Sequence, residues 1–96
     1  MTTAEKLDEA ALAAWLRAHP GWALQEGKLH TVYAFDDFAA AFGWMTRVAA
    51  VAEELSHHPE WFNVYGAVTV WLETHDAGGL TALDLTLADA MEDLLP

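Results

Sequence analysis

Apolar side chains recur along the chain with two different spacings, and these spacings predict its secondary structure. Recurrence at every third or fourth residue is typical of a helix with one buried face, whereas alternation is typical of a strand. The helical spacing occupies three segments: 3–18, 37–55 and a last segment that begins at Thr81. The alternating spacing occupies four segments: 21–25, 28–35, 62–65 and 67–74. We therefore expect two hairpins, with turns at Glu26-Gly27 and around Gly66.

The first and last predicted helices carry recognisable end signals. Thr2 and Glu5 have the spacing of a capping box at the start of the first helix, and His19-Pro20-Gly21 ends it. Thr81 and Asp84 have similar spacing at the start of the last helix. The apolar stripe expected on the last helix consists of Leu83, Leu87, Met91 and Leu94.

The second predicted helix is the longest segment with helical spacing. Asp36 or Asp37 can cap its start. Pro59 stops it, because a residue that precedes proline is disfavoured in the helical conformation. Its expected apolar stripe consists of Phe38, Phe42, Met45, Val48 or Ala49, Ala52 and Leu55.

The alternating segments divide their residues between two faces. The face expected to pack in the second strand holds Leu29, Thr31, Tyr33 and Phe35, and in the last strand Val68, Val70 and Leu72. The element order α-β-β-α-β-β-α lets the two hairpins join into one four-stranded antiparallel sheet, with the three helices on one face. The sequence thus predicts an α+β two-layer sandwich, as a single domain over 1–96. The other face of the sheet is left to water, a ligand or a partner subunit.

Composition and charge limit the partners of such a domain. Fifteen acidic residues against four basic ones give a net charge of −11, which argues against nucleic acid and anionic lipid because both are bound through Lys and Arg. The chain has no cysteine, which excludes disulfides, thiolate catalysis and cysteine-type zinc sites. No apolar stretch is long enough for a membrane span, and the acidic N-terminus lacks an apolar signal segment. We expect a cytoplasmic protein without membrane contact.

Three of the five histidines fall within nineteen residues, at His57, His58 and His75. Imidazole titrates closest to neutral pH of all side chains, so such a group can give and take protons. His57 and His58 stand where the second helix ends, and the turn that Pro59 imposes lets both rings line one pocket. These three histidines are the candidate catalytic residues.

The surroundings of His75 fit a site for a flat ligand. Alternation along 67–74 places His75 with Trp71 and Glu73 on the face away from the core. The glycine-rich loop that follows lets backbone approach a ligand closely. Trp61 and Tyr65 could form walls of the site by stacking on an aromatic ring.

Structural explanations compete with catalysis for some of these residues. A histidine at a helix C-terminus is a favourable cation, which would account for His57 alone. The capping spacing accounts for Asp84, although its carboxylate could also orient His75. Glu53 could be a solvated helix residue. Zinc binding by the histidines with a carboxylate is less favoured than acid–base chemistry, because adjacent histidines chelate a tetrahedral ion poorly.

Several motifs together resemble the pterin-4a-carbinolamine dehydratases. The most specific ones are His57-His58-Pro59-Glu60-Trp61-Phe62-Asn63-Val64-Tyr65 and Thr74-His75-Asp76-Ala77-Gly78-Gly79-Leu80-Thr81. Gly21-Trp22, the run from Phe35 to Ala49, and Ala52-Glu53 extend the resemblance over about 20–96. Two positions depart from the usual pattern: Ser56 stands where the family often has Asp, and Gly66 where it often has Asn. We expect these departures to change pocket detail or turn geometry rather than the reaction.

The resemblance implies a hydro-lyase that removes water from 4a-hydroxytetrahydrobiopterin to give the quinonoid dihydropterin, in recycling of tetrahydrobiopterin. It implies catalysis without a metal or other cofactor. His57 and His75 would transfer protons, His58 would orient the pterin, and Glu53 and Asp84 would support the histidines. The implied substrate-binding residues are Pro59, Glu60, Trp61, Tyr65, Thr74 and Asp76.

The family also implies partners, namely a homodimer or homotetramer and a functional link to an aromatic amino acid hydroxylase. The alternative is a pterin-binding or dimerisation module without catalysis, like relatives that stabilise a transcription-factor dimer. In that case the alanine-rich segment 37–55 would form a helix bundle with a partner copy.

Overall fold

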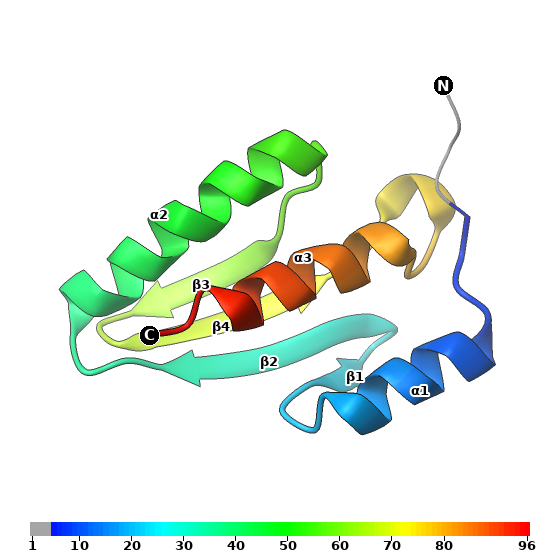
Figure 1. Ribbon diagram of the computed structural model, residues 1–96, viewed down its shortest axis with the longest axis horizontal. Helices are drawn as coiled ribbons and strands as arrows, with labels where there is room; N and C mark the ends of the chain where they lie inside the picture. Colours follow the sequence, from blue (N-terminus) through cyan, green and yellow to red (C-terminus); the bar gives the residue numbers. More distant parts are fainter. Residues whose placement is uncertain (1–4) are drawn as a thin grey trace.

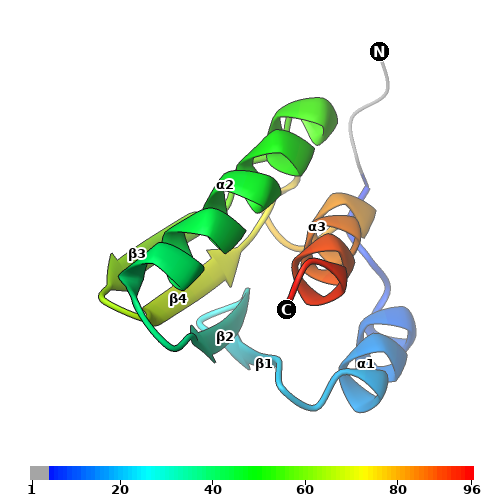
Figure 2. The same cartoon turned by 60° about the vertical axis from the view of Figure 1, so that its left-hand side comes forward.

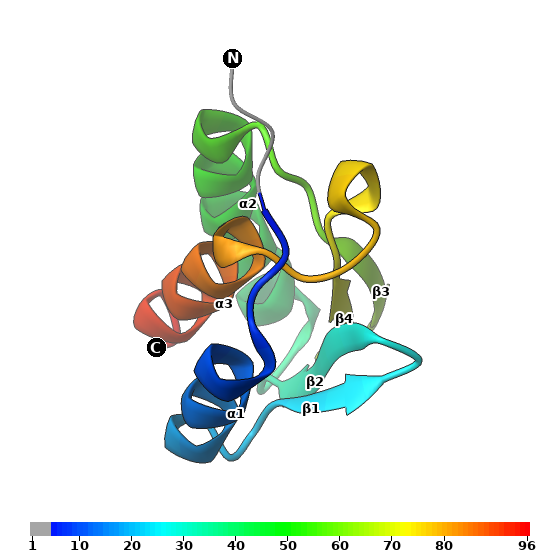
Figure 3. The same ribbon diagram turned by 90° about the vertical axis from the view of Figure 1, so that its right-hand side faces the viewer.

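Four antiparallel strands form one sheet in the spatial order β1-β2-β4-β3, and three helices cover one face of it (Figures 1 and 3). The structure is a computed structural model that describes residues 5–96. Its elements are α1 (Glu9–Ala18), β1 (Ala23–Gln25), β2 (Lys28–Ala34), α2 (Phe38–Leu55), β3 (Glu60–Val64), β4 (Ala67–Leu72), the 3-10 helix η1 (His75–Ala77) and α3 (Ala82–Asp93). The predicted α+β class and the element order are confirmed.

Side chains along the two central strands alternate between a packed face and an open face of the sheet, as predicted. β2 pairs with β4 in the register Leu29 to Leu72 and Tyr33 to Val68. Most of the predicted inner residues are buried, namely Leu29, Thr31, Tyr33, Val68, Val70 and Leu72. Phe35, also predicted there, follows the end of β2 and is only partly buried. On the open face Val32, Phe62 and Val64 are all more than half exposed, and Trp71 is partly exposed. The sheet is therefore amphipathic across its thickness.

Helices α2 and α3 run side by side over the packed face (Figure 2). The indole of Trp44 is fully buried between them, and its N–H donates to the carbonyl of Met91 at 3.1 Å. On α3, Leu87 and Met91 of the predicted stripe are buried, whereas Leu83 and Leu94 are partly buried. Within the described part of the chain, no helix combines the length and the apolar character needed to cross a membrane.

The predicted stripe of α2 is wrong at its N-terminal end. Phe38 and Phe42 are 50% and 53% exposed, whereas Ala41 and Trp44 are completely buried. The small side chain of Ala41 lets the helix approach the sheet closely, and Trp44 fills the core beside it. From Val48 onward, the prediction and the structure agree.

The start of α1 also differs from the prediction. Residues 5–8 lie outside the helix, and Leu7 N–H donates to the carbonyl of Leu80 at 2.9 Å. Helix α1 begins after Asp8, whose carboxylate caps it by accepting from Ala11 N–H at 2.7 Å. Of the predicted capping box, Glu5 is not helical and Thr2 lies outside the described residues.

The end of α2 sets the position of the histidine pair. Ser56 adopts the left-handed conformation with φ 50°, so the helix ends at Leu55, before the chain reaches Pro59. His57 N–H then donates to the carbonyl of Ala52 at 3.0 Å, which satisfies a free helix-end acceptor. This turn directs the chain from α2 back toward the start of β3, beside the end of β4.

Candidate active site

The three candidate histidines lie around one pocket where α2 ends and β4 leads into η1. The pocket has a volume of about 370 Å³. Its lining consists of Ser56, His57, His58, Glu73, Thr74, His75 and Asp76. The structure thus brings together two segments that are separated by a complete hairpin.

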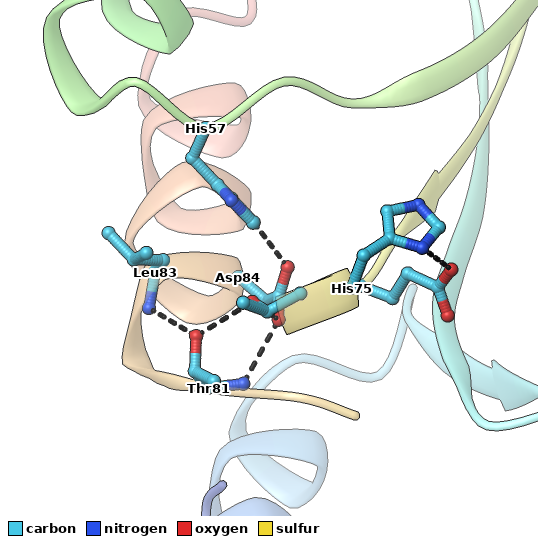
Figure 4. Close-up of polar contacts among 7 residues, drawn as sticks. His57, His75, Thr81, Leu83 and Asp84 are labelled. Atoms are coloured by element: carbon cyan, nitrogen blue, oxygen red, sulfur yellow. Dashed lines mark hydrogen bonds and ion pairs between the residues drawn. The ribbon is translucent and has the colours of Figure 1, made fainter. Parts of the chain in front are cut away.

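His57 forms the innermost pair of the pocket, with Asp84 of α3 (Figure 4). Its Nε2 atom lies 2.6 Å from Oδ1 of Asp84, whose side chain is fully buried. Because an ionised carboxylate only accepts hydrogen bonds, Nε2 of His57 carries the proton and donates it. Nδ1 is then the ring nitrogen that lies outside the pair.

The second oxygen of Asp84 is held by the start of α3. Oδ2 accepts from the Thr81 backbone N–H at 3.0 Å and from the Thr74 hydroxyl at 2.8 Å. The Thr74 hydroxyl proton is used in that bond, so in the 2.8 Å contact between the two threonine hydroxyls Thr81 donates to Thr74. Asp84 is therefore both a helix cap and the partner of a histidine, with one oxygen for each role. The negative charge is also favourable at a helix N-terminus.

This geometry corrects one expectation from the sequence. Asp84 was expected to orient His75, but it contacts His57 instead. The carboxylate beside His75 belongs to Glu73, with Oε1 located 3.1 Å from Nδ1 of the ring. His75 itself is well exposed, and Glu73 is mostly shielded.

His58 has a carboxylate partner of its own in Glu53, on the last turn of α2. Nε2 of His58 lies 2.8 Å from Oε1 of Glu53, and both side chains are exposed. Each of the three histidines is therefore paired with a different acidic residue, through one ring nitrogen. A carboxylate partner fixes the tautomer of a neutral imidazole and stabilises the ring when it is protonated.

The predicted substrate-binding residues divide into those that reach the pocket and those that do not. Thr74 and Asp76 line it. Trp61 packs into the core, with its ring centroid 6.1 Å from that of Trp44. Tyr65 lies in the β3–β4 turn, at the opposite end of the hairpin from His58, and is 65% exposed. A stacking role for Trp61 and Tyr65 in this pocket has no support from their placement.

Pro59 and Glu60 connect the pocket to the sheet. Pro59 is partly buried between the histidine pair and β3. The carboxylate of Glu60 accepts from Lys28 Nζ at 2.8 Å across the sheet. That hydrogen bond is the main reason why the pKa of Lys28 is raised.

Besides Ser56, which was noted only as a departure from the family pattern, the prediction missed Glu73 and the hydroxyl of Thr81. The sequence carried a signal for Glu73, because alternation along the strand placed it on the same face as His75. Thr81 was recognised as a cap, but its link to Thr74 joins segments that local spacing does not relate. Within residues 5–96, no three potential ligands among His, Asp and Glu come together as a metal site.

The fold and the pocket define a two-layer α+β protein with three histidine–carboxylate pairs where the helix layer meets the sheet. The chain belongs to the family described as pterin 4 alpha carbinolamine dehydratase, whose model matches residues 5–94.

Individual relatives agree with this assignment over nearly the whole chain. A protein of Jannaschia sp. (strain CCS1), named provisionally as a pterin-4-alpha-carbinolamine dehydratase, is 53% identical over 95% of this chain and 97% of its own length. A relative from Solibacter usitatus with the same name is 51% identical over 98% of this chain and 97% of its own length. A crystal structure of a transcriptional coactivator/pterin dehydratase from Brucella melitensis superposes with a TM-score of 0.90 at 40% identity, covering 96% of this chain and all of that one.

Proposed function

We propose that this chain removes water from 4a-hydroxytetrahydropterin by general acid–base catalysis and yields the quinonoid dihydropterin. In this reaction the bond between C4a and the hydroxyl oxygen breaks, and a ring N–H gives up its proton. An acid protonates the departing hydroxyl, and a base accepts the ring proton, so that one water leaves. Each well-placed acid or base contributes roughly 10²–10⁴-fold to such a rate.

One observation carries the proposal: three imidazoles line one pocket, and each has its own carboxylate partner. A protein that needed a histidine only as a helix-end cation would need one of them and no such pairing. Membership in the dehydratase family supports the choice of substrate.

The pairing suggests a division of roles. His57 and His75 lie on different segments at the two sides of the pocket, and we assign proton transfer to them. His58, with its exposed pair to Glu53, orients the pterin and shares in acid–base chemistry. Asp84 holds His57, and Thr74 and Asp76 contact the ligand from the pocket wall.

The experiment follows the ultraviolet decay of the carbinolamine, made in situ by a phenylalanine hydroxylase, in the presence of a chelator. We expect catalysis by the wild-type protein and a loss of roughly 10²–10⁴-fold in both His57→Ala and His75→Ala. His19→Ala is the matched control, because His19 lies at the end of α1, outside the pocket lining. A folded wild-type protein without activity, or a fully active His75→Ala variant, would contradict the proposal.

We further propose a homo-oligomer that uses the exposed side of α2, and a functional link to an aromatic amino acid hydroxylase that produces the substrate. Phe38 and Phe42 form an exposed aromatic pair on α2, with ring centroids 5.5 Å apart. Light scattering should give a mass above that of one chain, lowered by Phe42→Ser but not by Phe62→Ser on the sheet.

A further inference from the structure

Glu73 is the one acidic pocket residue that contacts a candidate catalytic histidine and has no role in the reaction described above. It follows the last residue of β4, on the open face of the sheet that also carries Trp71. Its side chain is only 21% exposed, whereas that of His75 is 78% exposed. A carboxylate held in place thus lies beside a ring that would otherwise turn freely in water.

The contact between these two residues has a direction. Oε1 of Glu73 lies 3.1 Å from Nδ1 of His75. The contact is an ion pair, and the negative charge beside Nδ1 favours a proton on that atom, which leaves the lone pair of the neutral ring on Nε2. Glu73 thus favours, through its charge, the tautomer of His75 that is protonated on Nδ1.

Neighbouring strands hold the charge of Glu73 in place. Lys28 Nζ lies 3.8 Å from the same Oε1 atom, and it is also bound to Glu60 at 2.8 Å. Lys28 on β2 and Glu60 on β3 flank the end of β4. The carboxylate of Glu73 is therefore held by its ion pair with Lys28, which is itself fixed by Glu60.

His75 differs in this respect from the other two pocket histidines. Both His57 and His58 donate through Nε2, to Asp84 and Glu53. Their free nitrogen is Nδ1, whereas the free nitrogen of His75 is Nε2. Nε2 is the ring atom farthest from the backbone, so it has the longest reach toward a ligand.

We propose that Glu73 is a positioning residue for the reaction, because it fixes the tautomer in which Nε2 of His75 is the base. This inference rests on the proposed dehydration for its catalytic part. The tautomer itself is a property of the ligand-free protein and is measured separately.

The first measurement is the ¹⁵N spectrum of the histidine rings, recorded at a pH where His75 is neutral. We expect mainly the Nδ1–H form for His75 in the wild-type protein, and a shift toward Nε2–H in Glu73→Gln, whose amide can donate to Nδ1. Glu54→Gln is the matched control. It makes the same chemical change at an exposed residue of α2, next to Glu53 in the sequence. A wild-type His75 that is mainly Nε2–H, or an unchanged ratio in Glu73→Gln, overturns the proposal.

The second measurement is the kinetics of the same variants. We expect kcat of Glu73→Gln to fall roughly tenfold, a part of the 10²–10⁴-fold that a complete general base supplies, with little change in KM. Glu54→Gln should keep both constants. A tautomer shift without a change in kcat removes Glu73 from the mechanism, although the dehydratase proposal then still stands. A wild-type protein without activity refutes the dehydratase proposal, although the tautomer assignment then still stands.

Discussion

Helix α3 carries a hydrogen-bonded carboxylate near each end, and comparing the two ends shows what makes one of them a candidate site. Near its N-terminus, Asp84 uses both oxygens, and one of its donors is His57. Near its C-terminus, Glu92 accepts with a single oxygen from the Tyr33 hydroxyl and from the Trp22 indole. The helix dipole favours a negative charge at the first end and disfavours it at the second. Hydrogen-bond donors therefore hold Glu92 although the dipole disfavours its charge, whereas Asp84 is stabilised by its donors and by the dipole together.

Each end also lies beside a cavity, and the larger of these two cavities has no histidine. It measures about 410 Å³ and is lined by Tyr33, Ala34, Phe35, Asp36, Ala40, Leu95 and Pro96. The pocket beside the other end measures about 370 Å³ and holds three imidazoles. A phenol and an indole stay protonated at neutral pH, whereas an imidazole exchanges its proton there. The kind of donor, rather than the size of the cavity, separates the two ends.

The largest expected effect comes from Asp84→Asn, which keeps the shape of the side chain but leaves one acceptor oxygen. If that oxygen still accepts from Thr81 and Thr74, the amide group faces the Nε2–H of His57, and donor meets donor. We expect the dehydration rate to fall roughly 10²-fold through the changed tautomer. The free energy of unfolding should fall by about 1–3 kcal/mol, because the buried hydrogen bond to a charged carboxylate is replaced by a weaker neutral one. Ultraviolet kinetics and urea denaturation measure the two effects.

Asp93→Asn is the control for this substitution, since it makes the same chemical change at an exposed position of the same helix. Both the rate and the stability should stay close to those of the wild-type protein. An Asp84→Asn variant with the wild-type rate would show that the reaction does not depend on the tautomer of His57.

A smaller effect is expected from the corresponding change at the other end of α3. In Glu92→Gln a single amide oxygen can still accept from both Tyr33 and Trp22, so unfolding should change by less than about 1 kcal/mol. Glu92→Ala removes the acceptor and should cost about 1–2 kcal/mol. The dehydration rate should be unaffected in both variants. A reduced rate in Glu92→Gln would mean that the two ends of α3 are coupled.

Local patterns predicted the sheet well and the helix faces less well. Alternation has a period of two, so it placed Leu29 and Val70 on the inner face without knowledge of their neighbours. On α2, apolar residues stand next to each other, as at Ala41 and Phe42. The spacing alone therefore does not tell which of the two neighbours faces the core. Close packing of the helix on the sheet decides it, and this packing favours the smaller residue.

The site shows the same limit. The spacing of the histidines and the family resemblance predicted that His57, His58 and His75 meet, and the structure brings them to one pocket. The partner of Asp84 could not be predicted, because Asp84 and His57 are 27 residues apart and only the packing of α3 against the end of α2 joins them. The partner of His75 was closer in sequence, two residues away on the same face of the strand.

The smallest effect near neutral pH concerns Tyr33, and it appears only in alkali. Burial, together with the hydrogen bond to Glu92, raises the pKa of the Tyr33 hydroxyl above its usual range. Above about pH 10 the unfolded chain therefore loses a proton that the folded protein retains, and stability falls by up to about 1.4 kcal/mol per pH unit. Tyr33→Phe should be less stable at neutral pH but should lose this additional alkaline slope. Tyr65→Phe, at the exposed tyrosine, should keep the slope in urea denaturation followed by circular dichroism. If the slope persists without the Tyr33 hydroxyl, another group on the folded protein retains the proton, and the buried hydroxyl beside Glu92 is not the source of the alkaline slope.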